Sequence, residues 1–265
     1  IDRANQHIYY SYTHTFVKCD FSGNVLGTLT GFKGHLGDIC FNEEDGRVYA
    51  SLNAPAKKAL YIAIIDVQNL DEIGLSAVKS GLVRTVHLQE IWKDRHTTLT
   101  NENGEVYKQR YGVGGSDGIC FGPSFMTGEG NYLTVGCGTR VEPEREDNDY
   151  QVILQYDVKA WWNVYAQPLN YKEYHHSGPY GCEGKYFVYT GHTTSGIQTM
   201  TYFNELNLWL VNVYPTKKKQ FNPYTLYAID GDVKPYKALL KGQPEEDEQY
   251  VLTLYTEGDY DKKNG

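Results

Sequence analysis

The sequence lacks the features that mark a membrane-spanning or nucleic-acid-binding protein. Its 265 residues contain no uninterrupted apolar run of about 18 residues, the length that a membrane-spanning helix needs. They contain no run of five like charges, and the formal net charge of −8 is opposite in sign to that of a typical nucleic-acid-binding surface. We therefore expect no membrane span, no nucleic-acid partner, and a ligand that is neutral or cationic.

Paired cysteines and a phosphate-binding loop are missing as well. The cysteine count of 5 is odd, and no two cysteines have the C-x-x-C spacing of zinc and redox sites, so at least one thiol should be free unless it pairs with another chain. The glycine-rich stretch GGSDGICFG at 114–122 leads into an aromatic-rich strand and has no P-loop lysine, which argues against a nucleotide cradle. No Ser-His-Asp triad can be assembled from residue spacing.

Tyrosine and glycine are abundant, with 24 and 27 residues. One interpretation is structural, because tyrosine suits half-buried strands and glycine suits tight turns. The other is functional, in which some of the aromatic side chains line a ligand-binding face, as in sugar-binding proteins. Both interpretations remain open at this point.

Three segments of the chain share one plan. Each has a polar lead-in with glycine, a strand led by isoleucine, a turn rich in Gly, Asn, Asp or Glu, and a second aromatic-aliphatic strand. The segments are GHLGDICFNEEDGRVYASL at 34–52, GGSDGICFGPSFMTGEGNYLTVG at 114–136 and TTSGIQTMTYFNELNLWLVNV at 193–213. Their leading isoleucines, Ile39, Ile119 and Ile197, lie 80 and 78 residues apart, a period that indicates repeated supersecondary units.

Each hairpin is followed by an apolar strand that ends in aspartate, and a fourth such strand lies near the N-terminus. These aspartates are expected to accept backbone N–H bonds in the next turn; they are Asp20, Asp66, Asp157 and Asp230. A fourth strand then follows, as in LVRTVHL and AQPLNY. Helix signals are poor, and only 68–80 has amphipathic spacing.

Four strands per unit predict an all-β fold, a β-propeller of four-stranded antiparallel blades. We expect four to six blades, one of them incomplete in this chain, in a single domain over residues 1–265 that is truncated at one or both ends. A two-layer sandwich is the alternative. The innermost strands should begin near the three repeated isoleucines, and function should lie in the long connections 93–113, 139–149 and 170–192.

The strands at the two ends of the chain leave open how the ring of blades is closed. The N-terminal strands HIYYSY and TFVKCDF have no isoleucine-led inner strand before them. The strand YVLTLY at 250–255 either closes the ring there or is the fourth strand of the Ile197 blade, and we favour the second because DKKNG at 261–265 resembles an interrupted loop. The chain opens with Ile1, so a secretion signal could have been removed, which weakly favours an extracellular or cell-surface location.

Polar residues just before the inner strands are candidates for a site. In a propeller the inner strands run alike around a central channel, so these residues should meet at one mouth and be able to bind a cation, transfer protons or hold a polyhydroxylated ligand. The candidates for catalysis are His35, Asp38, Asp117, Glu183 and His192. The candidates for ligand binding are Ser116, His175, His176, Thr194 and Ser195.

Each candidate also has a purely structural interpretation. Asp38 and Asp117 could cap turns, and His35 and His192 could hydrogen-bond between blades. His175 and His176 could form an exposed pair on a loop. Cys40 and Cys120, which follow equivalent isoleucines, are most simply explained as small residues packed between blades.

The stretch SDGICFGPSFMTGEGNYLTVG at 116–136 resembles the inner hairpin of calcium-dependent six-bladed lactonase-like propellers, the SMP-30/gluconolactonase and strictosidine-synthase-like superfamily. The resemblance implies a calcium site at Ser116 and Asp117, where Ser116 replaces the family's asparagine; the early glutamate and second asparagine have no counterpart. Aspartate and serine at the mouth also suit a hard, oxygen-ligated cation. The chain is similar as well to uncharacterised secreted propellers of Gram-positive gut bacteria.

These observations lead to one functional hypothesis and two alternatives. The hypothesis is an extracytoplasmic propeller that binds, and in its stronger form processes, a small polar molecule or carbohydrate at the mouth of the central channel. The first alternative is a non-enzymatic scaffold that binds a protein or glycan through tyrosine-rich loops. The second is a metal-dependent hydrolase or lyase with calcium as cofactor. Oligomeric state and substrate are not predicted.

Overall fold

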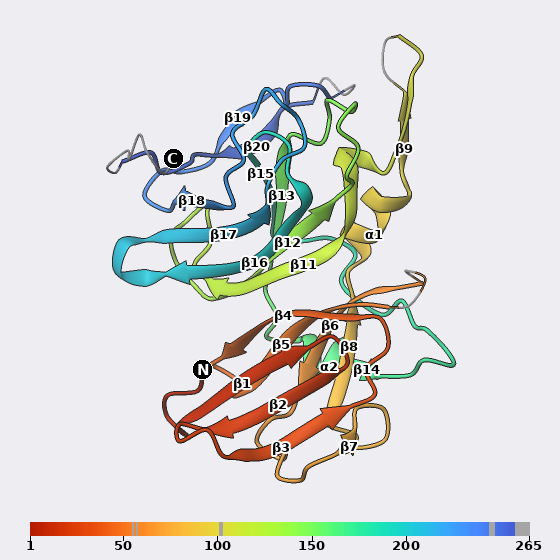
Figure 1. The fold of residues 1–265 in the computed structure, drawn as a ribbon, viewed down its shortest axis with the longest axis vertical. Coiled ribbons are helices and arrows are strands. Elements are labelled where there is room, and N and C mark those ends of the chain that lie inside the picture. Colours follow the sequence, from red (N-terminus) through yellow and green to blue (C-terminus); the bar gives the residue numbers. More distant parts are fainter. Residues whose placement is uncertain (55, 57, 101–102, 244–246, 258–265) are drawn as a thin grey trace.

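The computed structural model describes residues 1–265 except 55, 57, 101–102, 244–246 and 258–265. Four β-sheets account for most of the described chain (Figure 1). The first sheet contains, in spatial order, β1 (His7–Tyr12), β2 (Thr15–Asp20), β3 (Val25–Thr30) and β7 (Leu75–Ser76). The second contains, from its inner edge outward, β4 (His35–Asn42), β5 (Arg47–Asn53), β6 (Leu60–Ile65), β8 (Val83–His87) and β14 (Gln167–Pro168).

The third and fourth sheets form the other half of the molecule (Figure 1). The third contains, in spatial order, β11 (Val113–Gly122), β12 (Tyr132–Thr139), β13 (Tyr150–Tyr156), β15 (Gly184–Tyr189), β20 (Gln249–Leu252) and β19 (Tyr236–Ala238). The fourth contains β16 (Thr194–Phe203), β17 (Leu208–Tyr214) and β18 (Leu226–Asp230). The remaining elements are the helices α1 (Gln89–His96) and α2 (Trp161–Val164), the 3-10 turns Arg110–Gly112 and Asn204–Leu206, and the hairpin of β9 (Thr98–Thr100) and β10 (Val106–Lys108).

The sheets pack face to face in chain order, as the blades of a propeller do. One core cluster joins the first and second sheets, another joins the second and third, and another joins the third and fourth. Alternation along central strands produces this packing, because successive side chains point to opposite faces of a sheet. In β6, Ile62 and Ile64 belong to the core shared with the third sheet, whereas Ala63 and Ile65 belong to the core shared with the first.

The repeated isoleucines lie on the innermost strands, as predicted. Ile39, Ile119 and Ile197 lie on β4, β11 and β16, each the first strand of its sheet, and these three strands contact one another. The all-β propeller prediction is therefore confirmed. The sheets differ from uniform four-stranded antiparallel blades, since β7 is parallel to β3 and β20 is parallel to β15.

Three of the four aspartates at the strand ends have the predicted turn role. Asp20 accepts the backbone N–H of Asn24 at 2.8 Å, and Asp157 accepts that of Lys159 at 3.0 Å. Asp230 accepts the N–H of Asp232 at 2.9 Å, while Asp66 accepts the side-chain amide of Asn69 at 2.8 Å. All five cysteines are free.

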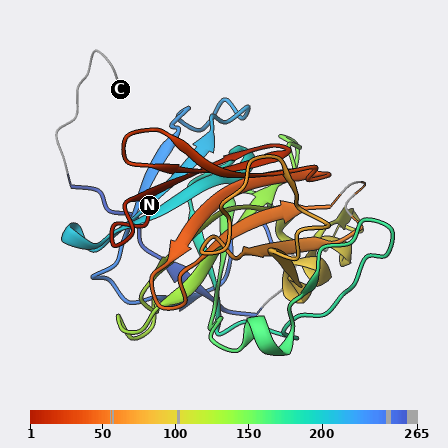
Figure 2. The ribbon, with the colours of Figure 1, turned by 90° about the horizontal axis from the view of Figure 1, so that it is seen from below.

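Residues 68–80, the stretch with amphipathic spacing, form no helix, because Gly74 has a left-handed φ of 84° and the next two residues pair with β3. One sequence prediction about an individual element was wrong. The strand in AQPLNY, β14, pairs with β8 of the second sheet, and the fourth strand of the third sheet is β15. The loop that follows α2 runs along the outside of the second sheet (Figure 2).

The segment 249–255 has two partners. Residues 249–252 form β20 beside β15, whereas Leu254 pairs with Ile229 at the edge of β18. The fourth-strand prediction for the Ile197 blade is confirmed for residues 253–255 and was wrong for residues 250–252. The stretch DKKNG lies outside the described residues. No helix in the described ranges is long and apolar enough to cross a membrane.

Candidate functional site

One carboxylate connects the three inner strands. Asp38, on β4, accepts the N–H of Ile39 at 3.0 Å through Oδ1. Its Oδ2 accepts the N–H groups of Ile119 on β11 and Met200 on β16, both at 2.9 Å. Burial raises the pKa of Asp38 to about 6, although the three N–H donors favour the charged form.

Irregular pairing makes this connection possible. The register of β4 with β5 shifts between Leu36 and Ile39, and that of β11 with β12 shifts between Ser116 and Gly118. The register of β16 with β17 shifts on both sides of Ile197. β-Bulges of this kind bend a strand and release backbone groups from the ladder. The three repeats thus share an irregularity beside their leading isoleucines.

Asp117 lies near Asp38 and is fixed by the second sheet. Asn53 donates through Nδ2 to Asp117 Oδ1 and to the Ser116 carbonyl, both at 2.9 Å. Ser51 Oγ donates to the Asp117 carbonyl at 2.7 Å. A Cβ at Gly138 would overlap with Asp117 Oδ2 and lie 3.2 Å from the Ser195 carbonyl oxygen, so this close approach requires glycine.

The structure therefore brings together part of the predicted set. Asp38, Ser116, Asp117 and Ser195 lie at the junction of β4, β11 and β16, and the exposed His35 opens β4 beside them.

The side chains of the other predicted residues contact other parts of the fold. His192 is buried and contacts Thr216 Oγ1 through Nδ1 at 3.1 Å, and burial lowers its pKa to about 4. Thr194 donates to the Pro215 carbonyl at 2.7 Å. Glu183 accepts the Asp157 N–H at 2.8 Å. His175 and His176 lie beside β8 at the outer side of the second sheet, where His175 contacts Thr85 Oγ1 at 2.7 Å.

Ser116 does not have the setting of a catalytic nucleophile. Residues 114–118 read Gly-Gly-Ser-Asp-Gly, which matches G-x-S-x-G, but that motif requires an exposed serine on a sharp strand-to-helix turn. Ser116 lies inside β11, is fully buried, and its Oγ has no hydrogen-bond partner in the described part of the chain.

The same residues offer few ligands for calcium. Ser116 and Asp117 supply one hydroxyl and one carboxylate, and the nearby Asn53 Oδ1 already accepts the Ser116 N–H at 3.3 Å. Calcium takes about six to eight oxygen ligands. Within the described ranges, no group of three or more His, Cys, Asp or Glu side chains has a metal-binding arrangement. Ser116 and Asp117 by themselves therefore supply fewer oxygen ligands than calcium takes.

A cavity lies at the opposite ends of the inner strands. Its volume is about 970 Å³, and its walls come from the residues that follow or end β4, β11 and β16, together with Arg3 from the segment before β1. Its aromatic side chains are Phe41, Phe121 and Tyr202, and its polar ones are Arg3, Glu43, Glu44, Glu129, Asn131, Asn204 and Glu205. A neighbouring cavity of about 670 Å³ shares Arg3, Phe41, Glu43 and Glu44.

The lining of the larger cavity has both flat apolar and polar hydrogen-bonding groups. Four glutamates face one arginine, so the local charge is negative and favours a neutral or cationic ligand. We call this the turn-end cavity. Sequence analysis placed the site at the other mouth and missed these residues, although the turns rich in Gly, Asn, Asp and Glu after each inner strand were the available signal.

The packed sheets define an all-β protein of the β-propeller class. Two solved structures are similar in arrangement at low identity. The β-propeller domain of Myceliophteria thermophila Cps50 (Swd1) is 10% identical, with a TM-score of 0.38 over 96% of this chain and 69% of that one. A protein of unknown function from Bacteroides caccae is 11% identical, with a TM-score of 0.36 over 95% of this chain and 84% of that one. No family model and no curated protein matches the sequence.

Proposed function

We propose that this propeller binds a small polyhydroxylated molecule, such as a carbohydrate, in the turn-end cavity. The observation that carries the proposal is the position and lining of this cavity, which spans three blades and combines three aromatic side chains with carboxylates and amides. Its volume of about 970 Å³ lies at the upper end of the range of small-molecule sites. Carboxylate and amide groups can pair with hydroxyls, while aromatic faces cover the apolar side of a ring.

Binding without catalysis is the form of the proposal that the contacts support best. The acid-base candidates Asp38, Glu183 and His192 are each engaged with backbone or side-chain groups of the fold. Lactonase-like chemistry, calcium dependence and an extracellular location stay predictions from the sequence.

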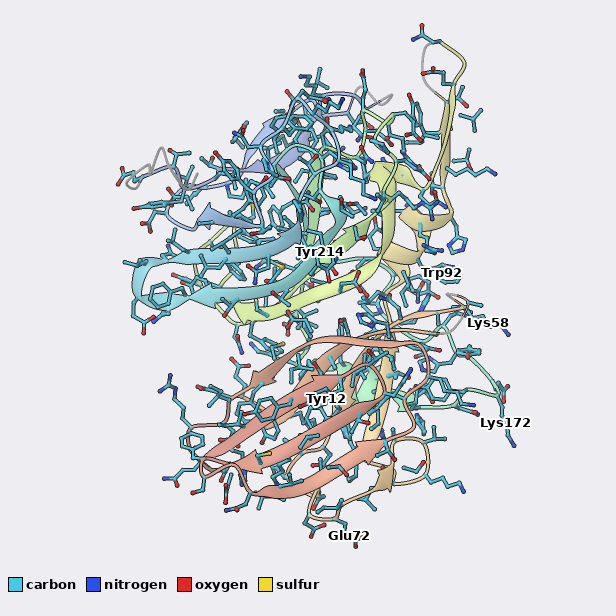
Figure 3. The ribbon with its side chains drawn as sticks, viewed as in Figure 1. Tyr12, Lys58, Glu72, Trp92, Lys172 and Tyr214 are labelled. Atoms are coloured by element: carbon cyan, nitrogen blue, oxygen red, sulfur yellow. The ribbon has the colours of Figure 1, made fainter. Side chains whose placement is uncertain are left out.

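A ligand screen tests the proposal. Wild-type protein is applied to a glycan array and to a library of sugars and polyols, and positive compounds are measured by calorimetry. Glu43→Ala and Glu205→Ala remove exposed side chains of the cavity and should each weaken binding about fivefold or more without a change in Tm. Glu72→Ala is the matched control, because this exposed glutamate lies at the far end of the molecule (Figure 3). The proposal fails if no polyhydroxylated compound binds, or if the cavity variants bind as tightly as the control.

A scaffold role is the second candidate, favoured by exposed tyrosines at strand ends. Tyr12 at the end of β1 is 61% exposed, and Tyr214 at the end of β17 is 56% exposed (Figure 3). Tyrosine is enriched in protein interfaces. If a macromolecular partner is captured whose binding is lost in Tyr12→Ser and Tyr214→Ser but kept in Glu205→Ala, the scaffold function replaces the one proposed above.

A further inference from the structure

Another cavity, which shares no lining residue with the two described above, lies where α1 meets the second sheet. Its volume is about 440 Å³, and it is lined by His87, Gln89, Trp92, Lys93, His176 and Tyr180. Trp92 belongs to α1, His87 ends β8, and the other wall comes from the loop that follows β14. Figure 3 places Trp92 and Lys58 at the same edge of the molecule. We call this the His87 pocket.

His87 is the unusual residue of this pocket. It is only 1% exposed, and neither Nδ1 nor Nε2 has a hydrogen-bond partner among the described residues. A buried polar group without a partner destabilises a fold, so its presence calls for an explanation. Burial lowers its pKa to about 3, so at neutral pH the ring carries one N–H donor and one free acceptor.

Aromatic rings surround His87 on the pocket side. The ring of His176 lies 4.6 Å away, centroid to centroid, and that of Trp92 lies 5.2 Å away, both edge to face. Trp92 and His176 are themselves 5.4 Å apart. Tyr180 stands at the rim and is 89% exposed. The walls are therefore mostly ring faces and edges.

The backbone around the pocket is fixed in advance. The Ser177 carbonyl accepts the His87 N–H at 2.8 Å, and Gln89 Nε2 donates to the Gly178 carbonyl at 2.8 Å. A Cβ at Gly178 would overlap with the His87 carbonyl, so only glycine allows this approach. His175 is held as well, because the Tyr61 hydroxyl donates to its carbonyl at 2.8 Å. A preformed wall lowers the entropic cost of binding.

We propose that the His87 pocket binds a small aromatic or heteroaromatic molecule with one polar group that hydrogen-bonds to His87. Ring packing against Trp92 and Tyr180 supplies the contact area, and rotation of the exposed His176 side chain gives the ligand access to the imidazole. This site is separate from the turn-end cavity and does not depend on the function proposed for it.

The composition of the pocket favours an aromatic ligand over a sugar. His87 offers the buried unpaired polar atoms of the lining, whereas Gln89 Nε2 is already engaged by two carbonyls. A monosaccharide would leave most of its hydroxyls without partners here, which costs binding free energy. A metal ion is not favoured either, because no three-ligand group occurs in the residues described.

Ligand-observed NMR with indole as the probe tests the proposal. Saturation-transfer spectra at pH 7.5 should show indole bound to the wild-type protein, and glucose should compete for it only weakly or not at all. Tyr180→Ala alters an almost fully exposed side chain and should weaken indole binding without a change in Tm. Tyr224→Ala, on an exposed tyrosine outside the pocket, is the matched control and should bind indole as the wild type does.

His87→Phe separates a binding role from a structural one. Phenylalanine keeps the ring packing and removes both unpaired nitrogens, so Tm should rise or stay constant while indole binding falls about fivefold or more. If His87→Phe lowers Tm strongly, the Tyr180→Ala and Tyr224→Ala pair decides the question by itself. The proposal is overturned if the wild type shows no transfer to indole, if Tyr180→Ala binds as the control does, or if glucose displaces indole at equal concentration.

Discussion

Replacing Asp38 should uncouple the three inner strands. The carboxylate accepts three backbone N–H groups from β4, β11 and β16. Asp38→Ala leaves these donors buried without an acceptor, at about 1–3 kcal/mol each. The substitution also removes the cost of burying the charged carboxylate, and this partly offsets the loss. A pKa of about 6 against the ordinary 3.8 puts that cost at about 3 kcal/mol at neutral pH. The expected net loss of unfolding free energy is about 3 kcal/mol.

The pH dependence of the same residue gives a sharper test. Because the folded-state pKa is raised, the fold favours the protonated form, and the contribution of Asp38 to stability decreases as pH rises from about 4 to about 6. Asp38→Asn has no proton to lose. Its unfolding free energy relative to wild type should therefore improve by about 2 kcal/mol across that window and change little above it.

Urea denaturation followed by circular dichroism measures both effects, from pH 4.5 to pH 7.5 for the Asn variant and at pH 7.5 for the Ala variant. Equal m-values would show that the variants unfold from equally compact states. The reasoning is refuted if Asp38→Ala stays within about 1 kcal/mol of the wild type, or if the Asn variant shows no pH trend relative to it.

Three further predictions concern buried contacts. Gly178→Ala should lower Tm by several degrees because a Cβ overlaps with the chain at residue 87, whereas Gly181→Ala, with open space around it, should be neutral by thermal denaturation. Lys218→Met removes the buried partner of the Asp149 carboxylate, which lies 2.5 Å from Nζ, and should lower the unfolding free energy by about 3–5 kcal/mol in urea denaturation. Lys219→Met is the exposed control, and equal unfolding free energies for the two variants would contradict the prediction. The unfolding free energy should also fall as pH drops below 6.5, because burial lowers the folded-state pKa of His87, His175 and His192 and favours their neutral forms. An unfolding free energy that stays constant between pH 7.5 and pH 5 would contradict this prediction.

The repeat at Ile39, Ile119 and Ile197 could be predicted from the sequence because each inner strand packs in the same way and so needs the same kind of residue. Periodic apolar positions reflect which face of a strand is buried, and that information is local. The turn role of three of the four aspartates could be predicted for the same reason, since the side chain bonds to backbone a few residues away.

The pairing of strands that lie far apart in the chain could not be predicted from the sequence. Strands β14 and β15 could each pair with the exposed edge of more than one sheet, because the apolar pattern of a short strand fits several sheet edges. Asp38 illustrates the same limit at the site. Its sequence context suggested either a turn cap or a catalytic group, while its actual partners include Met200, 162 positions along the chain. The turn-end cavity was missed because exposed glutamates in turns are ordinary on any surface.

The dual pairing of residues 249–255 affects the order in which a nascent chain can fold. The first two sheets, apart from β14, draw their strands from the first 87 residues, so they can form early during synthesis. The edges of β15 and β18 have no neighbour until residues 249–255 leave the ribosome. Two open edges on one intermediate invite pairing with other chains. A stop before residue 249 should therefore yield intermolecular association of nascent chains, and not a monomer that lacks one strand.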